Sequence, residues 1–163
     1  MNNITIKQKL KSLHRLQIIH SKIDKINIIA GELPNEIIVL KNELNDINNK
    51  IKNINLENEV LKEKINNCLN KKNELKSLLA EYDYKIKNVV DDNEFNELSK
   101  LIDINTLDIQ ISDKRVYEYK SHLIKNDAQI EKYNHTYKIK CSEITEKQSK
   151  LDEINKDTFK EKK

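Results

Sequence analysis

The stretch LPNEIIVLKNELNDINNKIKNINLENEVLKEKI, residues 33–65, repeats apolar side chains at alternating steps of four and three residues, and the spacing continues to Ile86. The repeating positions are Leu33, Ile37, Leu40, Leu44, Ile47, Ile51, Ile54, Asn58, Leu61, Ile65, Cys68, Lys72, Leu75, Leu79, Tyr82 and Ile86. Only Asn58 and Lys72 are strongly polar among them. A 3.5-residue period sustained over roughly seven heptads is typical of a left-handed coiled coil, whereas an ordinary amphipathic helix drifts out of this register.

A second heptad pattern begins at Phe95. One series, at every seventh residue, is nearly all apolar: Phe95, Ile102, Ile109, Val116, Leu123, Ile130, Tyr137, Ile144, Leu151 and Thr158. The other series is mixed: Leu98, Asn105, Ser112, Tyr119, Asn126, Tyr133, Lys140, Lys147 and Ile154. This pattern predicts a second long helix with one strong and one weak apolar seam.

The segment NVVDDNEF, residues 88–95, separates the two patterns and predicts a turn near residues 89–93. Asp91 followed three residues later by Glu94 matches a capping box that would start the second helix. The turn residues are Asp91, Asp92, Asn93 and Glu94. Because two long helices joined by a short loop run antiparallel, we expect an all-α fold, a long antiparallel coiled-coil hairpin over residues 35–160.

The position of the turn sets which residues face each other. With the turn centred near residue 92, Leu61 faces Leu123, whereas pairings slipped by one heptad need a turn centred near Asn88 or Phe95, which fits the loop less well. The same register places Asn58 opposite Asn126. An asparagine pair in a coiled-coil core costs stability but specifies alignment.

Lys72 faces Ser112 in this register. A lysine at a seam position can pack its aliphatic stem between the helices and extend its amine to solvent. We therefore count Lys72 and Ser112, with the asparagine pair, as register residues.

Residues 1–30 form a third expected element, a short basic helix. It carries Lys7, Lys9, Lys11, Arg15, Lys22 and Lys25 against one acid, Asp24. The chain has one glycine, Gly31, and one proline, Pro34. Gly31 can end a helix in the left-handed conformation and Pro34 can open the next one, so we predict a helix break or hinge at residues 31–34.

Composition limits the function. Charged residues are 35% and aromatic residues 5% of the chain, a composition that suits long solvated helices better than a thick hydrophobic core. The net charge is +3, which is too small for a surface that strongly attracts nucleic acid. Disorder is the rival interpretation of so polar a chain, and the apolar periodicity argues against it. We expect no membrane segment, and a reduced cytoplasmic protein, because Cys68 and Cys141 are isolated.

We expect no metal site, no cofactor and no enzymatic activity. The cysteines and the histidines are scattered along the chain, and a two-helix hairpin lacks a pocket that could desolvate a catalytic group. A single glycine also excludes a glycine-rich phosphate loop. The six basic residues of the N-terminal helix could contact nucleic acid or an acidic protein surface, or form an ordinary solvated face.

Two segments resemble one family. LHRLQIIHSKIDKINIIAGELPNEIIVLKNEL, residues 13–44, and DDNEFNELSKLIDINTLDIQISDKRVYEYK, residues 91–120, resemble the N-terminal parts of bacterial C4-type zinc-ribbon proteins with a coiled-coil hairpin, nearest to a Bacteroidetes-like branch. The resemblance implies an antiparallel hairpin followed by a zinc ribbon, and an adaptor role in transcription- or secretion-related regulation. This chain lacks the two cysteine pairs, so zinc is expected only if a missing C-terminal ribbon exists.

Three functional hypotheses follow. The first is a non-enzymatic coiled-coil adaptor or scaffold that binds a protein partner through the N-terminal helix and the base of the hairpin. The second is a nucleic-acid-associated protein that uses the basic helix, and the third is a structural remnant of a zinc-ribbon protein. Whether the chain forms a homodimer is left open by the sequence.

Overall fold

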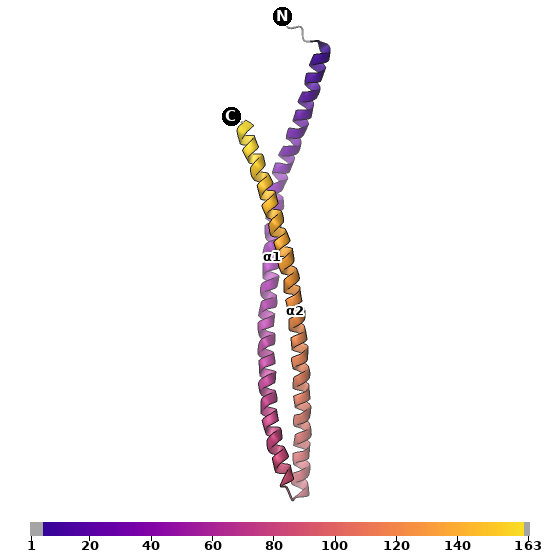
Figure 1. The fold of residues 1–163 in the computed structure, drawn as a ribbon, viewed down its shortest axis with the longest axis vertical. Helices are drawn as coiled ribbons and strands as arrows, with labels where there is room; N and C mark the ends of the chain where they lie inside the picture. Colours follow the sequence, from indigo (N-terminus) through magenta and orange to yellow (C-terminus); the bar gives the residue numbers. More distant parts are fainter. Residues whose placement is uncertain (1–4, 162–163) are drawn as a thin grey trace. The chain divides into compact units, whose positions relative to one another are not determined.

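The chain folds into two long α-helices. The computed structural model describes residues 5–161 of the backbone and the side chains of residues 5–157. Helix α1 runs over Ile6–Lys87 and helix α2 over Asp92–Glu161 (Figure 1). The described residues contain no strand. The predicted all-α class with two long, mutually packed helices is therefore confirmed.

The turn between the helices spans residues 88–91, which overlaps the predicted range 89–93, but the predicted turn residues Asp92, Asn93 and Glu94 belong to α2. Asn93 N–H donates a hydrogen bond to Asp91 Oδ1 at 3.2 Å, and Phe95 N–H donates to the Asp91 carbonyl at 3.0 Å. Asp91 is thus the N-cap of α2. Asp92 and Glu94 lie in the first turn of α2, at the positive end of its helix dipole.

The chain divides into two compact units. The unit Asn49–Asn134 holds two helical segments whose interface is formed by seam residues. Its buried apolar side chains are Leu61, Ile65, Leu75, Leu98 and Val116. Every one of them occupies a position that the heptad pattern assigns to the seam.

The other unit contains the chain up to Asn48 and from His135 onward. Its buried apolar side chains all come from α1: Leu33, Ile37, Leu40 and Ile47. On the α2 side the seam residues Ile144, Leu151 and Ile154 are half-buried. The apolar series of each helix therefore provides the packing here too.

The predicted break at residues 31–34, and with it the separate short helix over residues 1–30, is wrong. Helix α1 continues through Pro34, and Gly31 does not adopt a positive φ. Glycine and proline inside a helix cost about 1 and about 3 kcal/mol relative to alanine. Packing outweighs this local cost, because Leu33 and Ile37 are each only 5% exposed.

The seam itself also crosses the predicted break without a change of period. Before Leu33 the steps of three and four residues continue backward through Ala30, Ile26, Ile23, Ile19 and Leu16. A helix that ended at Gly31 would interrupt this alignment. The continuous α1 keeps the apolar stripe of its first 25 residues in line with the seam that contacts α2.

Candidate functional site

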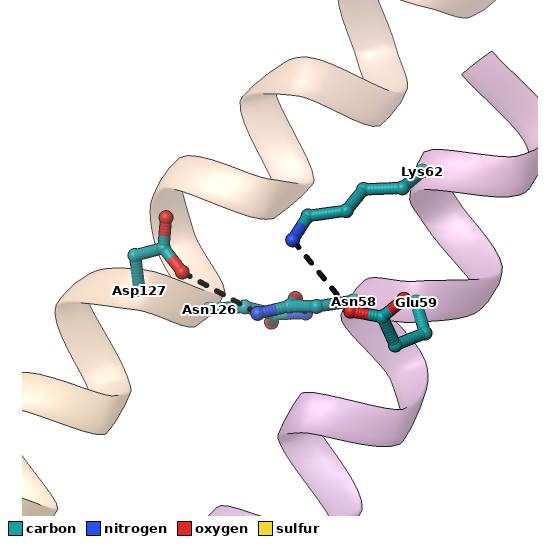
Figure 2. A network of polar contacts seen from close by, with 5 residues as sticks. All are labelled: Asn58, Glu59, Lys62, Asn126 and Asp127. Atoms are coloured by element: carbon teal, nitrogen blue, oxygen red, sulfur yellow. Dashed lines mark hydrogen bonds and ion pairs between the residues drawn. The ribbon is translucent and has the colours of Figure 1, made fainter. Parts of the chain in front are cut away.

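The asparagine pair lies in the interior of the unit Asn49–Asn134. Asn58 and Asn126 are each 6% exposed, and Asn126 Nδ2 donates to Asn58 Oδ1 at 2.9 Å. Asn58 Nδ2 in turn donates to Asp127 Oδ1 at 3.3 Å (Figure 2). These are the two asparagines that the sequence register places opposite each other. A slip by one heptad would place Asn58 against Tyr119 or Tyr133 and Asn126 against Ile51 or Ile65, so the amide–amide hydrogen bond would be lost and the pair favours one alignment.

Lys72 and Ser112 lie in the same unit. The ion-pair partner of Lys72 is a residue that the sequence register did not predict. Ser112 is buried at 5% exposure, while the Lys72 amine forms an ion pair with Asp113, the next residue of α2. The Lys72 side chain is 22% exposed. Its stem therefore packs at the seam and its charge is neutralised at the edge, as a snorkelling lysine does.

Ion pairs line the interface edge in the unit that contains the chain termini. Lys147 Nζ lies 2.5 Å from Glu36 Oε2, and Lys140 Nζ lies 2.5 Å from Glu43 Oε2. The hydrogen bond to Glu36 raises the pKa of Lys147 above its ordinary value. Sequence reasoning missed these pairs, although opposite charges at matching heptad positions of the two helices could have indicated them.

The acidic members of these pairs occupy one heptad position, directly before a seam residue of α1. Glu36 precedes Ile37 and Glu43 precedes Leu44. In the unit Asn49–Asn134, Glu57 at the same position lies 3.0 Å from His122 Nε2. We call this position the α1 edge; Glu36, Glu43 and Glu57 all contact the opposite helix from it.

The α1 edge also carries cation–π contacts. The Lys50 amine lies 5.8 Å from the centre of the Tyr133 ring, and the Lys64 amine lies 5.8 Å from the centre of the Tyr119 ring. Both lysines directly precede a seam residue. Tyr119 and Tyr133 are half-buried, so they serve packing between the helices rather than offering free rings for base stacking.

The first part of α1, residues 6–29, is exposed throughout. We call its uncovered seam residues, Leu16, Ile19, Ile23 and Ile26, the N-terminal seam; they are 53%, 55%, 41% and 45% exposed. The basic side chains predicted for partner contact all lie on this segment and are exposed: Lys7, Lys9, Lys11, Arg15, Lys22 and Lys25. A continuous row of exposed large apolar residues is unusual for a solvated helix.

The remaining features show no chemistry-bearing cluster. The surface around the turn is a shallow hollow lined by Tyr84, Val89, Val90, Leu98 and neighbouring polar residues. Among the side chains of residues 5–157, no three His, Cys, Asp or Glu groups gather as metal ligands, and Cys68 and Cys141 are free thiols. Neither α1 nor α2, as far as the structure describes them, has an apolar run that would let it cross a bilayer.

Comparison with known proteins identified no relative: the chain matches no family model, no curated protein and no solved structure.

Proposed function

We propose that this protein is a non-enzymatic coiled-coil adaptor or scaffold that binds a protein partner through the first part of α1. The observation that carries this proposal is the exposed N-terminal seam. Burying four such side chains from water would provide a substantial driving force, at about 25 cal/mol per Å² of apolar surface. In the proposal, α1 and α2 form an antiparallel coiled-coil hairpin that holds this segment in helical form before the partner arrives.

Preformed helical structure supports an adaptor role in physical terms. Most helical stability in proteins comes from tertiary packing, so a segment that had to become helical on binding would lose affinity to the ordering cost. Here residues 6–29 extend a helix that is stabilised by packing from Leu33 onward. The free thiols of Cys68 and Cys141 suit a reducing cytoplasm, which is where we propose the protein acts.

Removing apolar surface from the N-terminal seam tests this function. The double substitution Ile19→Ser and Ile23→Ser should lower the recovery of a specific partner from native lysate by roughly tenfold or more, because two buried apolar contacts are lost. Recovery is measured by quantitative mass spectrometry of proteins retained on the immobilised chain.

A matched control keeps the number of apolar substitutions constant. Leu10→Ser and Ile28→Ser remove two exposed apolar residues from the opposite side of the helix and should leave recovery unchanged. Circular dichroism should show equal helicity for both variants. If both variants and the unchanged chain retain the same proteins, the adaptor proposal fails and the structural-remnant hypothesis is favoured.

A nucleic-acid-binding function is the second candidate, and the exposed basic side chains of the segment 6–29 favour it. Binding driven by phosphates should weaken steeply with salt, with log K falling linearly against log salt by about 0.9 for each phosphate neutralised on duplex DNA. Fluorescence anisotropy with labelled duplex DNA and single-stranded RNA over a salt series measures this slope. If neither nucleic acid is retained at low salt, this candidate is excluded.

A further inference from the structure

The N-terminal seam continues an interface that is already in use. Ala30 is half-buried, and Leu33 is the first buried residue of the α1 seam that packs against α2. Toward the N-terminus the same period runs on through Ile26, Ile23, Ile19 and Leu16, but these side chains are exposed. In Figure 1 the first, indigo part of α1 has no helix packed along it. The apolar seam of α1 thus extends beyond the part that α2 covers.

The α1 edge is mixed where α2 covers it, with Lys50 and Lys64 placed over tyrosine rings, and it is basic at the uncovered positions before Ile23 and Leu16. At this position Glu36 and Glu43 pair with lysines of α2. The equivalent positions before Ile23 and Leu16 hold Lys22 and Arg15, both exposed. Carboxylates on a helix that covers the N-terminal seam in the orientation of α2 would pair with Arg15 and Lys22, as the lysines of α2 pair with Glu36 and Glu43.

The basic charge of the uncovered edge disfavours a second copy of the chain as the occupant. In the register that aligns both lysine positions of α2 with the edge, an α2 helix from another copy would bring Lys147 against Arg15 and Lys140 against Lys22. Two N-terminal segments packed together would bring six basic residues and one acid from each copy into contact. Like charges at the edge of a coiled-coil interface oppose pairing in both cases.

The distribution of apolar residues also disfavours a lipid surface. A helix that lies on a membrane needs one continuous apolar face and a basic face opposite. In residues 6–29, Leu10 and Ile28 lie on the side of the helix opposite Ile19, and Ile18 lies on the basic side, since successive residues turn by about 100°. Residues 6–29 instead present a narrow apolar seam with charged residues along its edge, a pattern that favours packing against another helix.

We propose that the N-terminal seam binds an acidic heptad helix of a partner protein, running antiparallel to α1, with carboxylates spaced seven residues apart that pair with Arg15 and Lys22. This proposal rests on the adaptor function and specifies the chemistry of its partner. Residues 16–30 offer about two heptads, or about 21 Å of helix. A partner segment of that length is too short to be stable alone, so it belongs to a longer, preformed helix.

The test uses two designed peptides of about four heptads, identical in their apolar seam, one with glutamate and the other with lysine at the edge positions. Fluorescein-labelled peptides are titrated with the full chain, and affinity is read by anisotropy. The acidic peptide should bind roughly tenfold or more tightly than the basic one at low salt, and the difference should shrink as salt rises.

Charge reversal on the chain supplies the decisive variant. The double substitution Arg15→Glu and Lys22→Glu should reverse the preference, so that the basic peptide binds better. Lys11→Glu and Lys25→Glu make the same change in net charge at positions turned further from the seam and should leave the preference for the acidic peptide intact.

Several results would overturn the proposal. The first is that the acidic peptide does not bind at all; the second is that the Arg15→Glu, Lys22→Glu variant still binds the acidic peptide better than the basic one. The third is that light scattering shows a dimer of the unchanged chain and a monomer of the Ile19→Ser, Ile23→Ser variant. Binding to vesicles of three parts phosphatidylcholine and one part phosphatidylserine that both charge variants weaken equally would assign the segment to lipid. If seam substitution abolishes partner recovery from lysate while the acidic peptide fails to bind, the adaptor function stands and this inference alone is wrong.

Discussion

Replacing Pro34 by alanine is expected to raise the free energy of local unfolding around residues 30–40 by up to about 3 kcal/mol. Pro34 lies inside α1, where it has no N–H to donate and its ring crowds the carbonyl four residues earlier. Alanine restores the hydrogen bond and leaves the buried neighbours Leu33 and Ile37 unchanged. Amide hydrogen exchange measures this local opening free energy directly.

Gly31→Ala is a second, independent test of whether α1 is continuous at residues 31–34. A Cβ at Gly31 would meet no other atom within 4 Å, and the backbone there is not left-handed. Alanine should therefore stabilise the segment by about 0.5–1 kcal/mol. At a helix-ending glycine the same substitution would destabilise, so the sign of the effect separates a continuous helix from a joint. Lys41→Ala, at an exposed helical position, should change little and serves as the control.

Removing one asparagine of the buried pair is expected to destabilise the unit Asn49–Asn134 by about 1–3 kcal/mol. In Asn126→Leu, the Asn58 Oδ1 loses the donor that lies 2.9 Å away and is left buried without a hydrogen bond. The double substitution Asn58→Leu and Asn126→Leu removes both amides and should exceed the original stability, because an apolar layer replaces a polar one. Denaturant unfolding measures both effects.

The pair Asn58 and Asn126 should also specify how the two helical segments align. Cysteines introduced by Leu61→Cys and Leu123→Cys, with Cys68 and Cys141 changed to serine, should cross-link efficiently within one chain. In the double leucine variant, cross-links from position 61 to positions 116 or 130, one heptad away, should appear. Asn55→Leu, at an exposed position, is the control and should permit no slip. A double variant that gains stability and keeps a single register would show that the asparagines do not specify alignment.

The sequence by itself determined the two helices, the turn and the pairing of Asn58 with Asn126. Each of these depends on a pattern that is visible locally or by simple matching: a 3.5-residue apolar period, an aspartate with N-cap spacing, and polar residues at facing seam positions. Such patterns predict the structure correctly because burial of the apolar seam is the main source of stability for long helices.

Only the tertiary structure decided that α1 crosses Gly31 and Pro34, that Lys72 pairs with Asp113, and that the N-terminal seam lies uncovered. Glycine and proline are strong local signals for a break, but their cost is a few kcal/mol and is offset by the packing of Leu33 and Ile37. The partner of a long lysine depends on which carboxylate its amine can reach. Exposure of Leu16 to Ile26 follows from where the opposite helix lies, and no period within α1 contains that information.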